Sequence, residues 1–420
     1  MSIQPAYSSA AIRFSPHLEA MRGFAALLVV WHHYVSFPKT LDPNYTPTGF
    51  WAYLAPSHFS VLIFFVLSGY VIGLTNQPPL TAQTIRGYVR KRFVRLYPIY
   101  VVCMLLAVLV GWGVGYSWAV ILGNLALLQI LLVPVIAENA PSWSLHFEVL
   151  YYALFIPISF FRIHPVVAAL AAFAVAIANV LLFPAHPLLS SYGFGFTFWL
   201  TGLILARYAG RLPHRQHSYQ LLLAVLLIFT SFQAFNAPTA ILQRLTAVVA
   251  GNRLEFLPGG DTFTTILSFY DLAWLPYAVL GIIVFAHKGF RHQKVVLGLL
   301  LLVPAFTARH ILAAWPSFDV AAYGLPSLCY GLGLLLLLHD FAWVERLAKP
   351  VIGGLARIGT LSYGLYIVHF PFMLLAMRLS FFSGSAFTFW VRFAVAVGAS
   401  LLTAYVLEKK FQPWVKARLL

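Results

Sequence analysis

Long apolar runs dominate this chain of 420 residues and limit what it can fold into. A bilayer-spanning helix needs about 20 consecutive, mostly apolar residues. Apolar residues make up 61% of the sequence and charged residues only 9%, whereas soluble domains carry about 25% charge. The composition excludes an ordinary soluble protein and predicts an all-α, polytopic transmembrane helix bundle. Twelve runs of spanning length cover residues 20–37, 58–75, 97–115, 143–161, 165–183, 191–207, 219–236, 267–286, 295–313, 320–338, 360–379 and 387–407.

The charges between these runs indicate how the chain is oriented. The net charge is +16, from 27 Lys and Arg against 11 Asp and Glu. With the N-terminus inside and twelve spans, 21 basic and four acidic residues fall on the cytoplasmic side, and the outer side has a net charge of −1. Basic residues favour short cytoplasmic loops, so we expect both termini to be cytoplasmic. Merging two weak pairs of runs keeps this orientation, so the sequence predicts ten to twelve spans. Because the charges are spread between membrane runs, they do not form a nucleic-acid-binding face.

A thirteenth apolar run, residues 118–134, contains Asn124 and Gln129 and ends at Pro134. Counting it as a span would move every later basic cluster to the outside, so we interpret it as a re-entrant or interfacial helix. The longest polar stretch between spans, 237–266, is too short for a soluble domain. The first 17 residues lack the basic start and cleavage pattern of a signal peptide, so we expect the first run to be a retained anchor.

Polar side chains inside apolar runs are costly and are therefore functional candidates. In the first run, Arg22 and His33 are eleven residues apart and share one helix face, about 16 Å apart along the axis. His32 points about 100° away from that face. A neutral imidazole in a dry site can take a proton from a hydroxyl or carry an acyl group. The alternative is that His33 is a hydrogen-bonded structural residue.

Five basic residues and no acid stand in the segment 85–98, which enters the membrane at Pro98. Arg92 and Arg95, three residues apart, share a helix face and could hold a phosphate group as a pair. The simpler interpretation is that these charges only set the orientation of the chain or contact anionic lipid headgroups. Five positive charges in ten residues exceed what orientation needs, so an anionic ligand such as a nucleotide-bearing cofactor is an equal alternative.

Glu148 lies a few residues inside the outer end of the run 143–161. A lone carboxylate there is costly unless it is paired or protonated. The predicted topology puts Glu148 and His33 in the same leaflet, and a carboxylate that orients an imidazole is a common catalytic pair. The sequence does not decide whether the two touch. Trp143 and His146 are further candidates in the same segment.

Other polar groups in the runs have structural and functional interpretations. Ser68 and Gly69 lie in mid-membrane, where small residues usually allow close helix packing. Ser362, Tyr366 and His369 follow one helix face, which predicts a hydrogen-bonded seam or a substrate-lining wall. Glu408, next to Lys409 and Lys410, is more typical of a structural ion pair.

Six segments, taken in chain order, resemble the acyltransferase-3 family of integral membrane acyltransferases. They are LEAMRGFAALLVVWHHY at 18–34, FFVLSGYVI at 64–72, RKRFVRLYPIY at 90–100, WSLHFEVLYY at 143–152, LSYGLYIVHFP at 361–371 and LEKKF at 407–411. The resemblance implies acyl transfer, most often of acetyl, from cytoplasmic acyl-CoA to envelope or exported glycans. We therefore expect residues 1–420 to form one membrane-embedded acyltransferase domain without a fused soluble domain, in the bacterial inner membrane.

The family motifs imply roles for particular residues. The arginine–glycine–histidine motif maps onto Arg22, Gly23 and His33, and thus favours His33 over His32. The family's arginine pair maps onto Arg92 and Arg95, and its glutamate after WSL maps onto Glu148. From these motifs and the polar residues described above, we expect catalysis by His33 and Glu148; acyl-CoA binding by Arg22, Arg90, Arg92 and Arg95; and substrate lining by Ser68, Trp143, His146, Tyr366 and His369.

Two features depart from the family pattern, and both lie beside Glu148. Many members carry a second acid at the position of Val149, so a two-carboxylate role is not expected here. His146 replaces a residue that is usually small, which could alter how an acceptor fits.

Two functions of different classes remain open. The first is an enzyme that O-acylates an exported or lipid-linked carbohydrate, with acyl-CoA, the glycan and membrane lipids as partners and no metal. The second is a proton-coupled exporter of a glycan or small anion, in which Glu148, His33 and His369 form a proton relay. Inverted repeats would favour the exporter, and the sequence shows none.

Overall fold

The computed structural model describes residues 15–37, 39–251, 253–255, 263–313 and 318–419. These ranges form helices and connecting turns without a β-strand, which confirms the predicted all-α bundle. The α-helices are α1 (Pro16–Ser36), α2 (Ser57–Thr75), α3 (Ala82–Val110), α4 (Trp118–Leu125), α5 (Trp143–Phe160), α6 (Pro165–Leu182), α7 (Leu188–Tyr208), α8 (Tyr219–Thr230), α9 (Ala237–Ala250), α10 (Leu275–Phe285), α11 (Gln293–Leu302), α12 (Thr307–Ala313), α13 (Leu325–Leu338), α14 (Ala342–Gly359), α15 (Ser362–Met377), α16 (Ala386–Val406) and α17 (Gln412–Leu419).

Seven helices of the described ranges are long and apolar enough to cross a membrane, and the bent pair α14–α15 raises the number to eight. This count is lower than the ten to twelve spans expected. Helices α1 and α5 have 21 and 18 residues, but polar side chains such as Arg22 and Glu148 lower their hydropathy. The apolar runs 219–236 and 267–286 contain helices that are shorter than a full span. The polytopic architecture is confirmed, but the lengths and ends of the helices are less regular than the apolar runs of the sequence.

Helix α14 occupies residues that the charge pattern had placed in an inner loop. Its buried residues Val344, Ala348 and Ile352 recur every four positions and form one apolar face. This helix packs closely on α1. A Cβ added at Gly23 would lie only 2.1 Å from the carbonyl oxygen of Leu355, which leaves no room for a side chain. The glycine of the first motif therefore allows a close helix–helix approach. At its end α14 meets α15 at an angle of 76°.

The thirteenth apolar run contains no helix long enough to cross a membrane, and its re-entrant or interfacial position stays a prediction. Only Trp118–Leu125 is helical, a length of about 12 Å. The buried Asn124 side chain bonds to the carbonyl oxygens of Val120 and Pro134 and to the amide of Ile136. These bonds hold the segment as a folded excursion beside α3.

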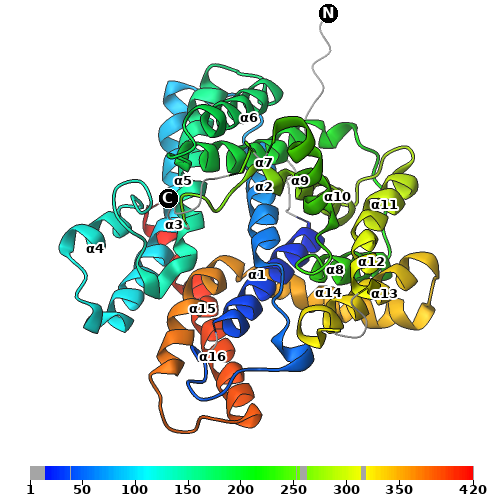
Figure 1. The fold of residues 1–420 in the computed structure, drawn as a ribbon. Coiled ribbons are helices and arrows are strands. Elements are labelled where there is room, and N and C mark those ends of the chain that lie inside the picture. The colour runs from blue at the N-terminus through cyan, green and yellow to red at the C-terminus, as the bar shows by residue number, and fades with distance from the viewer. Residues whose placement is uncertain (1–14, 38, 252, 256–262, 314–317, 420) are drawn as a thin grey trace, which may run out of the picture.

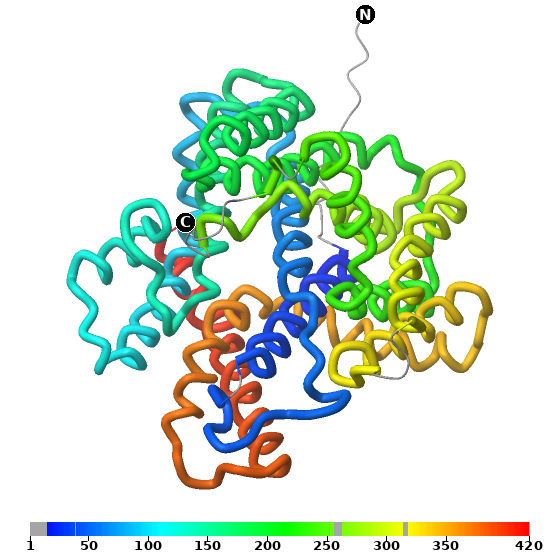
Figure 2. The backbone as a smooth tube through the Cα atoms, in the orientation of Figure 1, coloured from blue at the N-terminus to red at the C-terminus, as the bar shows by residue number. Residues whose placement is uncertain are grey.

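Helix α1 lies in the middle of the bundle, with α15 and α16 beside it and α3, α4 and α5 farther out on one side (Figure 1). The tube view shows that the segment following α1 runs beside the turn between α15 and α16 (Figure 2). Asp42 in that segment accepts hydrogen bonds from Ser383 and Thr388 at 2.6 and 2.8 Å. These hydrogen bonds fix the segment that follows the outer end of α1, where His33 is located.

Candidate active site

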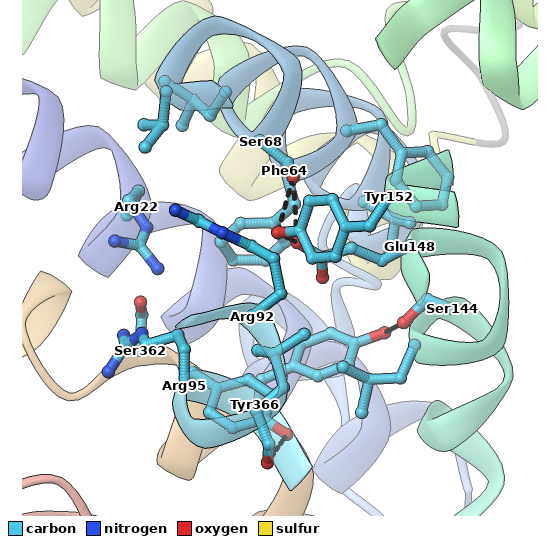
Figure 3. Close-up of a pocket in the computed structure, with 17 residues that line it drawn as sticks. Arg22, Phe64, Ser68, Arg92, Arg95, Ser144, Glu148, Tyr152, Ser362 and Tyr366 are labelled. Atoms are coloured by element: carbon cyan, nitrogen blue, oxygen red, sulfur yellow. Dashed lines mark hydrogen bonds between the residues drawn. The ribbon is translucent and has the colours of Figure 1, made fainter. Parts of the chain in front are cut away.

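A cavity opens where α1, α2, α3, α5 and α15 meet (Figure 3). These helices contain five of the six segments that carry the family resemblance. Figure 3 shows the guanidinium groups of Arg22, Arg92 and Arg95 on one side of the cavity, and Glu148 with Tyr152 on the other. Its polar lining residues are Arg22, Ser68, Arg92, Arg95, Ser144, Glu148, Tyr152, Ser362, Tyr363 and Tyr366.

Glu148 is held by two hydroxyl groups. Oε1 of Glu148 accepts hydrogen bonds from Tyr152 at 2.5 Å and from Ser68 at 2.9 Å. The indole Nε1 of Trp199 donates to Ser68 at 3.2 Å. Ser68 therefore has both a carboxylate within hydrogen-bond reach and a fixed orientation, which the sequence did not reveal.

Gly69 has the packing role that the sequence suggested. A Cβ on Gly69 would lie 1.8 Å from the carbonyl oxygen of Trp199, and one on Gly202 would lie 1.9 Å from that of Val66. Helices α2 and α7 thus approach each other backbone to backbone on both sides of Ser68. This close contact places Trp199 against Ser68.

Arg92 is the cation of this cavity whose charge has the fewest protein partners. Its guanidinium lies 5.8 Å from the ring centroid of Tyr88 and 5.9 Å from that of Tyr152. Its Nε is buried without a hydrogen-bond partner among the described residues. A buried donor without a partner is costly, so this atom points to a ligand that the cavity can hold.

The other three predicted cofactor-binding arginines differ from one another. Arg95 lines the cavity, but its Nη1 bonds to Glu408 at 2.7 Å, so much of its charge is compensated. Arg22 lies 3.5 Å from Glu19 and also lines the cavity. Arg90 lies on the exposed side of α3 and is not among the lining residues. Glu408 thus forms the structural ion pair that the sequence indicated, with Arg95 as its partner, and the grip of Arg92 and Arg95 on a phosphate stays a prediction.

The seam predicted on α15 is present. Ser362 and Tyr366 line the cavity, and Tyr366 shares a hydrogen bond of 2.8 Å with Ser144. The Oγ of Ser362 is a second buried polar atom without a hydrogen-bond partner in the described part of the chain. His369 lies one turn beyond Tyr366, with their ring centroids 6.3 Å apart.

His33 and His369 form a pair beyond Tyr366. Nδ1 of His33 lies 2.8 Å from Nε2 of His369, and the rings are stacked with centroids 5.0 Å apart. Nδ1 of His369 lies 3.2 Å from the carbonyl oxygen of Leu365. A carbonyl oxygen can only accept, so in neutral rings His369 donates to Leu365 and His33 donates to His369. The remaining nitrogen of His33, Nε2, is then the one that can accept a proton.

Two interpretations from the sequence are corrected by these contacts. Glu148 bonds to Ser68 and Tyr152, whereas His33 bonds to His369, so His369 and not Glu148 orients the His33 ring.

Both ring nitrogens of His146 bond within the protein, to the Leu127 carbonyl oxygen and the Tyr192 hydroxyl, each at 2.6 Å. His146 does not line this cavity, and neither does Trp143, which packs among aromatic rings.

Sequence reasoning missed Tyr152 and Tyr363 as lining residues. Tyr152 stands four residues after Glu148, which places the two on the same helix face. This spacing could have identified Tyr152 as the partner of Glu148. No comparable signal exists for Tyr363, because its hydroxyl bonds to the Leu96 carbonyl oxygen on a distant helix.

Comparison with known proteins identifies the family of this chain. Residues 16–241, just over half of the chain, match the family model described as an acyltransferase domain. The chain is 29% identical over 150 residues to acyltransferase MdmB of Streptomyces mycarofaciens, which covers 33% of this chain and 38% of that protein. No solved structure matches the chain. This chain therefore belongs to the acyltransferase-3 family, and its helices are long and apolar enough for a multi-pass membrane protein.

Proposed function

We propose that this protein transfers an acyl group from cytoplasmic acyl-CoA to a hydroxyl of an exported or lipid-linked carbohydrate. The observation that carries the proposal is the succession of groups through the bundle. Three guanidinium groups and a carboxylate line one cavity, and an oriented histidine pair lies beyond Tyr366. The first set suits an anionic donor, and the second suits deprotonation of an alcohol. We place the protein in the bacterial inner membrane, where these two substrates would approach from opposite sides.

Arg92 and Arg22 are the proposed contacts for the anionic donor. Charge-assisted hydrogen bonds from guanidinium to phosphate are among the strongest in proteins. The unpartnered Nε of Arg92 and Oγ of Ser362 support a ligand in this cavity, because a bound substrate would satisfy both atoms. Arg95, fixed by Glu408, contributes a positive field and the shape of the wall.

His33 is the proposed general base. Its Nε2 takes the proton of the acceptor hydroxyl while the hydroxyl oxygen attacks the thioester carbonyl. The carbon–sulfur bond then breaks, and the proton on His33 passes to the departing CoA thiolate. His369 holds the His33 ring in the tautomer that this transfer requires. Transfer through an acyl-enzyme would use the same cavity and the same acceptor site.

The proposal is tested by comparing His33→Ala with His32→Ala in cells that make the acceptor glycan. His32 bonds to the Ala55 carbonyl oxygen and, in the described part of the chain, forms no hydrogen bond with either ring of the histidine pair, although its ring lies edge-on to that of His33. Mass spectrometry of the envelope glycans should show loss of an ester of defined mass in His33→Ala and its retention in His32→Ala. Both variants should reach the membrane in wild-type amounts. A fully active His33→Ala enzyme would overturn the assignment of the base.

The exporter hypothesis makes a different prediction for the purified protein. Proteoliposomes would show glycan or anion flux in the absence of any acyl-CoA. Flux that needs no thioester but is lost in His33→Ala would favour proton-coupled transport over acyl transfer.

A further inference from the structure

A second cavity lies between α3 and α5, and its lining is almost entirely apolar. Side chains that contribute to it include Val89, Phe93, Leu96, Tyr97, Val149 and Ile156. The residues of α3 that line it run from Tyr88 to Tyr100, which are about 18 Å apart along the helix axis. At its far end Tyr100 donates to the carbonyl oxygen of Asn124, so the excursion around α4 closes that end.

This apolar cavity adjoins the cavity of the candidate active site. Arg92, Tyr152 and Tyr363 line both, together with Leu96 and Leu145. Arg92 is the charged residue at this junction, and it borders the polar cavity that contains Glu148. A single ligand can therefore place a polar group at Arg92 and an apolar part between α3 and α5.

Five tyrosines line the apolar cavity, and the hydroxyls of all but Tyr97 donate to groups of the protein. Tyr88 donates to the carbonyl oxygen of Tyr152 at 3.2 Å, and Tyr363 donates to that of Leu96 at 2.8 Å. Tyr100 and Tyr152 donate to Asn124 and Glu148. These four hydroxyls have no second proton to offer a ligand. The space between α3 and α5 therefore suits a hydrocarbon, and a sugar or nucleotide would leave its polar groups unsatisfied.

We propose that this cavity holds the hydrocarbon chain of the donor's acyl group, and that the preferred chain is several carbons longer than acetyl. The inference rests on the proposed function, since it assumes that acyl-CoA binds in the adjoining polar cavity. The acyl chain enters at the junction formed by Arg92, Tyr152 and Tyr363 and extends between α3 and α5. The family resemblance implies acetyl most often, but the single methyl of an acetyl group would leave this space unfilled.

Burial of each methylene group increases affinity by about fourfold. The four additional methylenes of hexanoyl-CoA would give about 250-fold if all were fully buried, so with partial burial it should bind at least about tenfold more tightly than acetyl-CoA. Calorimetry on the full-length protein in detergent can compare the Kd values of CoA, acetyl-CoA and hexanoyl-CoA. These measurements need no knowledge of the acceptor.

Two variants fill the cavity from α5. Val149→Phe acts from its half-buried wall and Ala153→Phe from its exposed edge, so the test continues if one of them fails to fold. Each should reduce the preference for hexanoyl over acetyl to less than about threefold. Leu154→Phe is the matched control, because Leu154 is on the same helix and lines neither cavity. Because longer acyl chains partition into detergent equally in every variant, comparison with Leu154→Phe also corrects for that effect.

Three outcomes decide the inference. A chain-length preference that is lost in Val149→Phe and Ala153→Phe but kept in Leu154→Phe supports it. Equal affinity for acetyl-CoA and hexanoyl-CoA in the wild type, or the same loss in Leu154→Phe, overturns it and leaves the proposed function standing. Failure of CoA and both thioesters to bind overturns the proposed function and this inference together.

Discussion

Nδ1 of His33 lies 2.8 Å from Nε2 of His369, so the proposed base is oriented by a second imidazole and not by a carboxylate. The second ring is itself fixed by the carbonyl oxygen of Leu365, one helical turn earlier on α15. This chain of contacts sets the tautomer of His33 without placing a negative charge in the bundle. It also connects α1, which carries the base, to α15, which lines the cavity through Tyr366.

His369→Ala should reduce kcat by about a hundredfold, because His33 would lose the partner that selects its tautomer. The KM for acyl-CoA should change little, since Arg22 and Arg92 are untouched. His369→Gln should recover part of kcat, because the amide oxygen can accept from Nδ1 of His33. Steady-state kinetics in detergent measures both constants. If kcat and the melting temperature fell together while KM rose, His369 would only support the fold.

Arg92→Ala and Arg95→Ala should have different effects although both side chains line the same cavity. Arg92 has no ion pair in the described chain, so its removal should weaken acyl-CoA binding by about tenfold with little change in melting temperature. Arg95→Ala leaves the buried Glu408 without its partner at 2.7 Å. This should destabilise the protein by roughly 1–3 kcal/mol.

The control for the second effect is the double variant Arg95→Ala, Glu408→Gln. Removing both charges should restore part of the melting temperature lost in Arg95→Ala, because no uncompensated charge remains buried. Thermal unfolding in detergent measures the stabilities. If Arg92→Ala lowered the melting temperature more than Arg95→Ala did, the division of roles between the two arginines would be wrong.

Gly69→Ala should be severely destabilising even though it adds one carbon atom. The new Cβ would lie 1.8 Å from the carbonyl oxygen of Trp199, a backbone atom that cannot move alone. Helices α2 and α7 would have to separate, which would also displace Trp199 from Ser68. Gly87→Ala on α3 is the matched control, since a Cβ at Gly87 would meet no heavy atom within 4 Å. That change should stabilise the helix by about 1 kcal/mol. Equal melting temperatures for the two variants would contradict this packing.

The sequence predicted those parts of the site that follow from helix periodicity. The spacing of Ser362, Tyr366 and His369 placed them on one face, and the structure shows this face along the cavity and the histidine pair. The runs also predicted most helices near their observed ends. Helix α14 was missed because its charged residues resemble those of a cytoplasmic loop, although its buried positions recur every four residues.

Contacts between distant parts of the chain could not be predicted from one sequence. Arg95 meets Glu408 across 313 positions, and His33 meets His369 across 336. A helix face shows which side chains point together, but it does not identify the helix that packs against it. The apolar cavity between α3 and α5 is likewise a property of packing, and neither helix alone indicates it.

A histidine cluster outside the spans should make the stability of the protein fall in acid. Burial, followed by the proximity of His17, His217 and His214, lowers the pKa of His287 from 6.5 to about 4. The ring bonds to His17 at 2.9 Å and accepts from the amide of His217. Because the folded pKa lies below the unfolded one, the unfolded state binds more protons between these values. Stability is therefore fully present above pH 6.5 and is lost as the pH falls toward 4.

His287→Gln should flatten the fall in melting temperature between pH 6.5 and 4, since a neutral amide has no proton to bind in this range. His186→Gln, at an exposed position between α6 and α7, should retain the wild-type pH profile. Thermal unfolding in detergent across this pH range distinguishes the two. If His287→Gln kept the wild-type slope, other groups would have to account for the acid sensitivity, and the buried imidazole would not be its source.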